Sequence, residues 1–575
     1  MEIVGAVSLS LIIVPGIFGS PESPAHDEID YDRIGYAPPE AYEAGSKYPY
    51  YGSYSRKGFL ETEFTEETLQ LYKRRGQYQI LDIVRGRTEE AAQYCRTLLA
   101  ENPDDPEFHY TLSIAQSRLG DVEGALRSME EALALGLPFE RYLAGPRELL
   151  CSLTETDAFR ETASRYDIQL IHGPLLGCVT DTSARFWVRT VSESSVQVKV
   201  SRFRDLTHPI ESDVKFSDSD EDYTTVVQIS GLQPDTTYYY DVTIDGRSGL
   251  DTKDLSFRTY PIGGKKARFQ VGFGGGAGYV PWHERIWDVI KSHRPIAFLL
   301  LGDNVYLDMP EAVHAGHHYT YYRRQSRPEF RRLTSSTSIY SIWDDHDTAT
   351  NDVFMGPYRE KPDWKMSLFH LFRQNWNNPA YGAAEWPGAW YRFNIADVDF
   401  FMLDGRFYRT NPHAENPTML GPVQKAWLLE ELKSSEATFK VIVSPVPWSF
   451  EAKGDSLDTW NGYREERNEI FQFLSDNRSD GVVLLSADRH RSDLWRIERP
   501  DGYALYEFES SRLTNEHDHQ VMPDSIFGYN EKQSFGLLTF DTTRPDPTVK
   551  YQIYSIDNEL IYTLEVKRSE ILHAQ

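Results

Sequence analysis

Five short apolar runs in the second half of the chain each end abruptly at polar, glycine or proline residues. Continuous apolar runs of this length are typical of strands buried on both faces of a sheet. The runs are 296–301 before Gly302 and Asp303, 339–343 before Asp344 and Asp345, 400–403 before Asp404, 441–444 before Pro445, and 482–486 before Ala487 and Asp488. In open α/β sheets, ligands bind beyond the carboxyl ends of such strands. We therefore expect residues far apart in sequence to meet at one site, and their oxygen and imidazole groups favour metal ions.

Size and charge limit the classes of protein that this chain can form. A chain of 575 residues exceeds the size at which one hydrophobic core stops growing, so several domains are expected. The net charge of −27 argues against general affinity for nucleic acid or anionic membrane. It leaves a nuclease or phosphatase open, because bound cations can reverse the local sign of charge. Three scattered cysteines (Cys95, Cys151 and Cys178) predict neither a zinc cluster nor a disulfide scaffold.

Residues 1–20 have features of a secretory signal segment. The stretch 3–18 is mostly apolar and is followed by Gly19 and Ser20, which could border a cleavage site. The usual basic residues before the apolar stretch are missing, and Glu2 is the charge found there. We expect a secreted or periplasmic protein, with an uncleaved anchor as the alternative. No other stretch approaches the roughly 18 apolar residues that a membrane span needs.

Residues 61–165 are predicted to form a helical module. Ala91 and Leu98 are followed 34 residues later by Ala125 and Ala132, a spacing that resembles a tetratricopeptide repeat. About one and a half such repeats are visible, and so short an array cannot bury its own faces. We therefore expect the module to pack on its neighbours. It could brace the rest of the chain or bind a protein partner.

The remaining regions differ from the helical module and from one another. Residues 21–60 are rich in Tyr, Pro, Gly and acids, which predicts an extended linker. Residues 168–260 alternate polar and apolar side chains in short runs, and 232–240 resembles the tyrosine corner of a fibronectin- or immunoglobulin-like β-sandwich. Residues 265–567 alternate strand runs with helical stretches. This last pattern predicts an α/β domain of layered β-sheets flanked by helices.

Residues 302–306 place a carboxylate and a phenol beyond the first apolar run. Gly302 allows the backbone to turn sharply off the strand. Asp303 could bridge two cations with its two oxygens. Tyr306 could supply a phenolate, which a trivalent metal favours by lowering the pKa of the phenol. The alternative is a turn aspartate beside a packed tyrosine.

Four titratable side chains, residues 344–347, follow the second run. They would be costly to bury unless they were neutralised, and metal coordination neutralises them. Asn351, a few residues on, offers a neutral amide oxygen. His346 could be a ligand or a general acid for a leaving alcohol, with Asp345 orienting it. A solvated acidic loop is the alternative, which the apolar run before it argues against.

The later runs add further candidates. Asp488 and His490 are two residues apart, so in extended chain their side chains point the same way and could each hold one metal of a pair. Arg406 could grip phosphate oxygens with its two-pronged guanidinium, or it could pair with Asp404. Residues 319–324 are basic and aromatic, and either line the entrance to the site or pack against the sheet.

These motifs, in this order, resemble the PhoD-type alkaline phosphatase/phosphodiesterase family, a branch of the calcineurin-like metallophosphatases. The family's Gly-Asp-x-x-Tyr is matched by Asp303 and Tyr306, its Trp-Asp-Asp-His block and later Asn by 343–346 and Asn351, its Leu-Asp-x-Arg by 403–406, and its Asp-x-His by Asp488 and His490. The resemblance covers roughly residues 168–565 and includes a small β-sandwich before the catalytic domain.

The resemblance implies a phosphatase that holds iron(III) with one or two calcium ions. On this basis the metal ligands are Asp303, Tyr306, Asn351, Asp488 and His490, and the catalytic residues are Asp345, His346 and Arg406. The chain departs from the family at one ligand, a cysteine that usually ends the first strand. Here 269–273 continues into Gly274, Gly275 and Gly276. Another group or water fills that position, the metal differs, or activity is lost.

Three interpretations follow. The favoured one is a metal-dependent phosphoesterase in which Asp303 bridges two ions that hold a hydroxide for attack on a small phosphate mono- or diester. A second is a non-catalytic binding or scaffold protein built on a degraded phosphatase domain, because the cysteine is missing and the helical module is added. A third keeps the enzyme but changes its substrate to phospholipid or nucleic-acid diesters.

Overall fold

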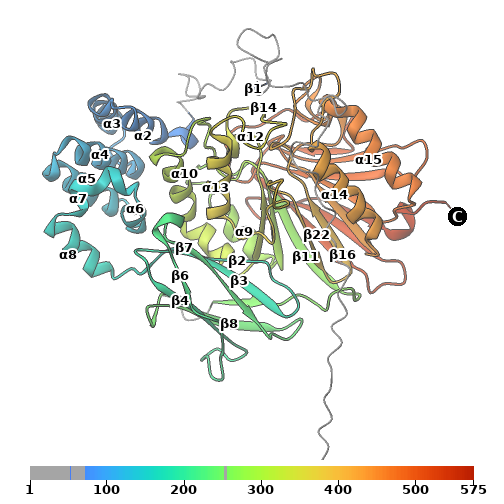
Figure 1. Cartoon of the computed structure of the whole chain (residues 1–575), viewed down its shortest axis with the longest axis horizontal. Coiled ribbons are helices and arrows are strands. Elements are labelled where there is room, and N and C mark those ends of the chain that lie inside the picture. Colours follow the sequence, from blue (N-terminus) through green and yellow to red (C-terminus); the bar gives the residue numbers. More distant parts are fainter. Residues whose placement is uncertain (1–51, 54–70, 251–254, 575) are drawn as a thin grey trace, which may run out of the picture.

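The computed structural model describes residues 52–53, 71–250 and 255–574 (Figure 1). The predicted signal segment and most of the predicted linker lie outside these ranges. Residues 52–53, which form β1 (Gly52–Ser53), pair with β14 (Val353–Phe354). The chain ahead of the helical module therefore already touches the part of the molecule that carries the candidate motifs. Among the helices of the described ranges, none is both long and apolar enough to cross a membrane.

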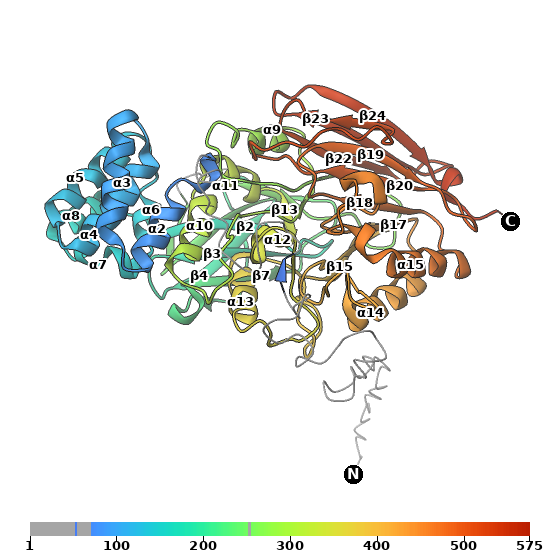
Figure 2. The same ribbon diagram turned by 90° about the horizontal axis from the view of Figure 1, so that it is seen from above.

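The helical module begins after a short 3-10 turn, η3 (Tyr72–Arg74). Its helices are α2 (Gln77–Val84), α3 (Thr88–Glu101), α4 (Pro106–Leu119), α5 (Val122–Ala134), α6 (Glu140–Ala144), α7 (Arg147–Thr154) and α8 (Asp157–Tyr166). The Asp105 side chain caps α4 by accepting backbone N–H bonds, and Gly120 ends that helix in a left-handed conformation. Ala315 and Tyr319 of α10 (Ala315–Gln325) belong to the module's hydrophobic core. This confirms the prediction that the module packs on its neighbours, and Figure 2 shows α2 beside α10.

Residues 170–258 form two antiparallel sheets. One sheet has the order β2 (Leu170–Gly177), β3 (Ser183–Thr190), β7 (Thr224–Ser230). The other has the order β10 (Ser256–Arg258), β8 (Thr237–Ile244), β4 (Ser195–Ser201), β5 (Ile210–Glu211), with β6 (Lys215–Phe216) beside β4 and β9 (Arg247–Ser248) beside β8. The Tyr238 hydroxyl accepts the backbone N–H of Gln233 at 2.9 Å, so the tyrosine fixes the turn before its own strand.

Residues 268–567 contain a six-stranded and a seven-stranded sheet, and we call this region the two-sheet domain. The first has the order β13 (Ser338–Ile342), β12 (Ala297–Leu301), β11 (Arg268–Gly274), β22 (Ser534–Asp541), β23 (Thr548–Ser555), β24 (Leu560–Lys567). The second has the order β15 (Tyr391–Ile395), β16 (Val398–Met402), β17 (Phe439–Val443), β18 (Val482–Ser486), β20 (Leu505–Ser510), β19 (Ser492–Ile497), β21 (Phe527–Tyr529). Pairing is parallel among β11, β12 and β13, and among β16, β17, β18 and β20.

All five apolar runs are strands buried on both faces, as predicted. In β12, Leu299 faces the core between the two sheets, whereas Phe298 faces the core shared with α9 (Ile286–Ser292) and α11 (Pro328–Thr334). In β17, Val441 faces the central core and Ile442 faces the core of α14 (Gly421–Ser434) and α15 (Arg464–Asp476).

The runs are divided between the two sheets, which agrees with the predicted domain of layered β-sheets. β12 and β13 belong to one sheet, and β16, β17 and β18 belong to the other. Because the sheets pack face to face around one core, the loops that leave both sets of strands can still meet. Two further helices lie near these loops, α12 (Asp345–Thr348) and α13 (Lys365–Asn375).

Candidate active site

The loops that follow β12 and β13 lie in direct contact. Gly302 has φ +105°, and a Cβ at this position would lie 2.5 Å from Cβ of Asp344. A side chain here would therefore both strain the backbone and push the two loops apart. The glycine explains how the chain can turn off β12 and present Asp303 next to the acidic residues that follow β13.

Asp303, Tyr306 and His490 meet from strands of different sheets, and we call them the phenol half of the site. The Tyr306 hydroxyl donates to Asp303 Oδ2 at 3.0 Å and lies 3.0 Å from His490 Nε2. His490 Nε2 lies 3.8 Å from Asp303 Oδ2. All three residues are buried, and Asn515 donates its amide to the Tyr306 hydroxyl at 2.6 Å. The sequence reasoning missed Asn515, which follows β20 without any pattern that marks it.

The electrostatics of the phenol half favour uncharged forms when only protein groups are present. Burial, with the nearby Asp345 and Asp344 carboxylates, raises the pKa of Asp303 well above its ordinary value, although His346 opposes this shift. Burial, followed by the field of Asp303, raises the pKa of Tyr306. Burial, with positive charge nearby, lowers the pKa of His490 well below its ordinary range. A bound cation would reverse the first two shifts, because it stabilises carboxylate and phenolate.

His346 follows β13 and is held by a carboxylate that the sequence reasoning did not select. Its Nδ1 pairs with Asp308 Oδ1, and Asp308 is fully buried. Asp345 instead accepts the backbone N–H of His346 at 3.0 Å and that of Asp352 at 2.7 Å. The expectation that Asp345 orients the imidazole is therefore wrong, since its oxygens hold backbone groups of the α12 region.

The charge on His346 is fixed by its acidic surroundings. Burial disfavours the imidazolium, but the carboxylates of Asp308, Asp345 and Asp303 outweigh it and raise the pKa of His346 to about 10. The ligand atoms of Asp303, Asp345 and His346 lie within 4.8 Å of one another. His346 is thus a protonated group placed next to the carboxylate that was expected to bridge cations.

A second group of acids surrounds one ammonium, and we call it the lysine half: Lys453, Asp352, Asp458 and Asp488. Lys453 Nζ lies 2.9 Å from Asp458, 3.1 Å from Asp352 and 3.3 Å from Asp488. Asp345, Asp352 and Asp458 also bring their oxygens within 4.8 Å of one another, so Asp345 belongs to both groups. Asn351 lies half-buried in the turn next to Asp352. Lys453 and Asp458 come from the segment between β17 and α15, which contains none of the predicted site residues.

Arg406 lies at the floor of the site with no exposed surface. Its guanidinium donates to Asp344 at 2.5 Å, to Asp458 at 2.6 Å and to the carbonyl of Val353 at 3.0 Å. Arg409 binds the same Asp458 carboxylate at 2.6 Å. Neither sequence expectation for Arg406 describes this arrangement. The guanidinium donors bind buried protein oxygens. Asp404 accepts the backbone N–H of Arg406 at 2.8 Å and does not pair with the Arg406 side chain.

The glycine run lies against the phenol half and leaves no room for a thiol. A Cβ at Gly276 would lie 3.2 Å from His490 Cδ2 and only 2.1 Å from the carbonyl oxygen of Ser511. The free cysteines are elsewhere: Cys95 in α3, Cys151 in α7 and Cys178 after β2.

Two further imidazoles lie on the open side of His490. His517 and His519 follow β20, and their Nε2 atoms are 3.0 Å apart. Ligand atoms of these two residues and His490 lie within 4.8 Å of one another. The sequence does contain a His-x-His pair at this place, and a search for metal-ligand spacing would have found it.

The donor groups fit a metal cation. Asp303 Oδ1 is buried and has no hydrogen-bond partner in the described residues, and His490 Nδ1 is in the same state. Carboxylate, phenol and imidazole are ligands of hard and intermediate metal ions. An unpaired buried carboxylate oxygen beside a phenol and an imidazole is what a cation would stabilise.

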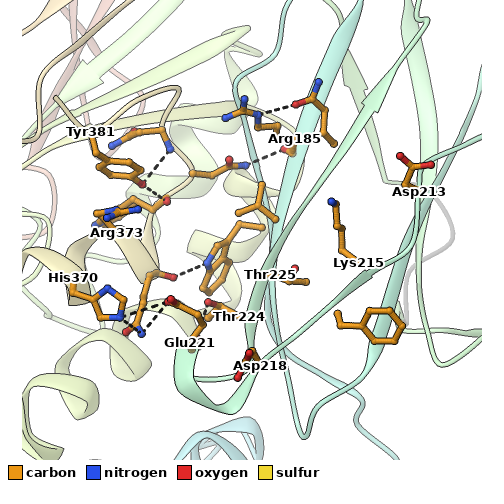
Figure 3. Close-up of a pocket in the computed structure, with 18 of the residues that line it drawn as sticks. Arg185, Asp213, Lys215, Asp218, Glu221, Thr224, Thr225, His370, Arg373 and Tyr381 are labelled. Atoms are coloured by element: carbon orange, nitrogen blue, oxygen red, sulfur yellow. Dashed lines mark hydrogen bonds and ion pairs between the residues drawn. The ribbon is translucent and has the colours of Figure 1, made fainter. Parts of the chain in front are cut away.

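A separate cavity lies between the sandwich and α13, away from these residues (Figure 3). It has a volume of about 750 Å³, and its walls come from β3, β6, β7 and α13. Its labelled charged residues have both signs: Arg185, Lys215, Arg373, Asp213, Asp218 and Glu221. No residue of the phenol half or the lysine half lines it.

Comparison with known families gives three matches along the chain. Residues 273–543 match the family described as PhoD-like phosphatase. Residues 167–262 match a domain of unknown function (DUF7800), and residues 85–144 match the tetratricopeptide repeat. The first range lies within the two-sheet domain, the second covers the two antiparallel sheets of residues 170–258, and the third lies within the helical module.

Known proteins are similar to parts of this chain. Alkaline phosphatase D of Bacillus subtilis (strain 168) is 30% identical over 114 residues, which span 16% of this chain and 20% of that protein. A structure titled as that of PhoD superposes with a TM-score of 0.54 at 15% identity, covering 68% of this chain and 91% of that chain. Purple acid phosphatase PPD1 from yellow lupin (Lupinus luteus) gives 0.53 at 10% identity, covering 69% and 75%. These structural likenesses concern the fold, and the match to the PhoD-like phosphatase family covers residues 273–543, just under half of the chain.

Proposed function

We propose that the chain is a metal-dependent phosphoesterase that hydrolyses small phosphate mono- or diesters. The observation that carries this proposal is the meeting of Asp303, Tyr306 and His490 in a buried position, with one carboxylate oxygen left unpaired. The PhoD-like phosphatase match and the alkaline phosphatase D relative support it.

We further propose iron(III) for the phenol half and calcium beside it at Asp303 and Asp345, because Lys453 already pairs with the carboxylates of the lysine half. Phenol and carboxylate suit a trivalent ion, and clustered carboxylate oxygens suit calcium. Because Gly276 leaves no space for a thiolate, the first ion would be held without one. A bound cation supplies Lewis acidity, which lowers the pKa of water and withdraws negative charge from the phosphate.

The chain's own residues would orient the groups of the site and protonate the leaving oxygen of the ester. The imidazolium of His346 is held at Nδ1 by Asp308, which leaves Nε2 to donate a proton to the leaving oxygen. Asp345 holds the loop that carries His346 through two backbone N–H groups. Arg406 holds Asp344 and Asp458 in place. Burial raises the pKa of Asp458, but Arg406, Lys453 and Arg409 outweigh it and keep that carboxylate ionised. Water is the nucleophile, so no covalent enzyme intermediate is required.

Metal content and hydrolysis, measured together, test this function. The full chain, purified without chelator, should contain bound metal and cleave p-nitrophenyl phosphate or its bis ester. Asp303→Ala should lose both, whereas Asp213→Ala, an exposed change on the sandwich, should lose neither. Metal and activity retained in Asp303→Ala would refute the proposal. The ratio of rates on the two esters then distinguishes monoesterase from diesterase.

A non-catalytic binding protein is the second candidate. It is favoured by Lys453, which places a protein ammonium among three carboxylates that could otherwise bind a cation. A purified chain with neither bound metal nor turnover would support it.

The helical module could also bind a protein partner, as tetratricopeptide repeats do. Its α2 and α4 faces are already used, because α2 packs on α10 and Glu107 of α4 bonds Tyr319. A partner would therefore contact the exposed sides of α3 and α5. A pull-down with the full chain and with Tyr94→Ala, an exposed aromatic on α3, tests this surface.

A further inference from the structure

We propose that Arg74, which lies outside the phosphatase domain, is a positioning residue for His346 and acts through Asp308. This inference rests on the proposed phosphoesterase function. Arg74 ends the 3-10 turn before α2, ahead of the residues that match the tetratricopeptide repeat. The segment that leads into the helical module would thus complete the active site of the domain that follows it.

One buried carboxylate joins Arg74 to His346. Asp308 Oδ2 accepts from the Arg74 guanidinium, and Asp308 Oδ1 pairs with His346 Nδ1. Arg74 is 2% exposed and Asp308 is fully buried. Because each oxygen has its own cationic partner, the carboxylate cannot rotate without breaking one of two ion pairs. The orientation of the imidazole is therefore fixed from the helical-module side.

The backbone on both sides of Arg74 is held by the phosphatase domain. Gln77 donates its amide to the carbonyl oxygens of Tyr306 at 2.6 Å and Leu307 at 2.7 Å. Arg323 of α10 donates to the carbonyls of Lys73 and Arg75, both at 2.7 Å. These bonds bracket Arg74, and those of Gln77 engage the loop that carries Tyr306 and Asp308.

Lys73 adds a second contact of the same segment with the phenol half. Its ammonium lies 3.9 Å from the centroid of the Tyr306 ring, and the residue is 5% exposed. A buried lysine has a high desolvation cost, so its presence against this ring indicates a fitted site instead of a chance surface contact. Residues 73–77 thus touch two groups of the site, Tyr306 and the His346–Asp308 pair.

The loss of Arg74 should affect the proton transfer that His346 performs. Without its second partner, Asp308 is free to turn, and the imidazole loses its fixed direction toward the leaving oxygen. Misplacement of a catalytic group by about 1 Å can cost on the order of 10²-fold in rate. The loss should be large for an alkyl phosphate, whose leaving alkoxide needs a proton, and small for p-nitrophenyl phosphate, whose leaving group does not.

The experiment compares full-length variants on these two esters. Arg74→Gln should lower kcat on the alkyl ester about 10- to 100-fold and leave the p-nitrophenyl ester near wild type, with Arg74→Lys restoring part of the loss. Arg85→Gln is the matched control, because Arg85 pairs with Glu311 at 2.8 Å between the same two segments but at an exposed position. In a His346→Gln background, Arg74→Gln should have no further effect.

Two results would overturn the proposal: equal loss on both esters, or the same loss from Arg74→Gln with and without His346. A readout free of turnover separates this failure from failure of the proposed function. The Nδ1 proton of His346, observed by NMR in histidine-labelled protein, should show a strong hydrogen bond that Arg74→Gln and Asp308→Asn both weaken. An inactive wild type would refute the phosphoesterase, whereas an unchanged proton signal in Arg74→Gln would refute the positioning role.

Discussion

The two halves of the site balance buried negative charge in different ways. In the phenol half, Asp303 accepts a hydrogen bond from Tyr306, and its other oxygen has no hydrogen-bond partner among the described residues. In the lysine half, three carboxylates share the ammonium of Lys453, and Asp458 also binds Arg406 and Arg409. Buried carboxylates need compensation from some cation. The comparison indicates that Asp303 keeps an oxygen available for a cation from outside, even beside His346 and Lys73, whereas each carboxylate of the lysine half already pairs with a protein cation.

The largest effect should come from removing the charge of Asp303. Asp303→Asn should lower kcat/KM on the order of 10⁴-fold and abolish metal binding, because the unpaired oxygen is lost as an anionic ligand. Asp488→Asn should cost much less, since Lys453 already balances that carboxylate. Steady-state kinetics and metal analysis of both variants test the difference. Equal losses would mean that the two halves bind metal alike.

The next effect concerns stability. Asp458→Asn should destabilise the folded chain by about 3–5 kcal/mol, because it leaves Arg406, Arg409 and Lys453 without their shared anion in a buried position. Chemical denaturation of the metal-free protein measures this change. Asp455→Asn, three residues away and exposed, is the control and should be neutral. A neutral Asp458→Asn would contradict the self-balanced lysine half.

Removing the ammonium should make the lysine half resemble the phenol half. Lys453→Met should destabilise the folded protein in the absence of divalent ions. A divalent ion bound at Asp352, Asp458 and Asp488 should then stabilise it. Calcium at about a hundredfold excess over its Kd should then add about 2.7 kcal/mol to the stability of this variant. Thermal unfolding with and without calcium measures it, with the exposed Lys433→Met as control. No calcium response would show that the ammonium is not standing in for an ion.

The smallest effect lies outside both halves, in an ion pair that needs no metal. Burial raises the pKa of Asp222, but Arg189 and His318 outweigh it and lower the pKa to about 2. The charged carboxylate is favoured in the folded state, so its contribution is complete above pH about 4 and is lost as pH falls through about 2. The contribution is about 2 kcal/mol. Acid denaturation of wild type and Asp222→Asn measures it, and curves that differ by the same amount at pH 2 and pH 5 would contradict it.

The sequence predicts the strands and the phenol half because both have local signals. Apolar runs followed by polar residues located β12, β13 and β18, and the Asp and Tyr of one loop lie on the side where they were expected. Asp308, Lys453 and Asp458 were missed because each comes from a loop without periodicity, and their roles arise only when loops pack together. The partners of Arg406 were predicted wrongly for the same reason.

The contact of Arg74 with Asp308 had no sequence signal either. The two residues are 234 positions apart, and the helical module showed its repeat spacing but not the surface on which it docks. The order of residues along the chain does not determine which surfaces of two domains will meet. Such a contact is decided by the shape and charge of both surfaces together.

Anomalous diffraction from crystals of the full chain, grown without chelator, locates bound metal ions. We expect a strong anomalous peak within bonding distance of Asp303, Tyr306 and His490. We also expect Lys453, and not a metal, at the centre of Asp352, Asp458 and Asp488 unless the lysine is replaced. A map with no peak at the phenol half, or with its main peak elsewhere, would show that Asp303, Tyr306 and His490 do not form the main metal site.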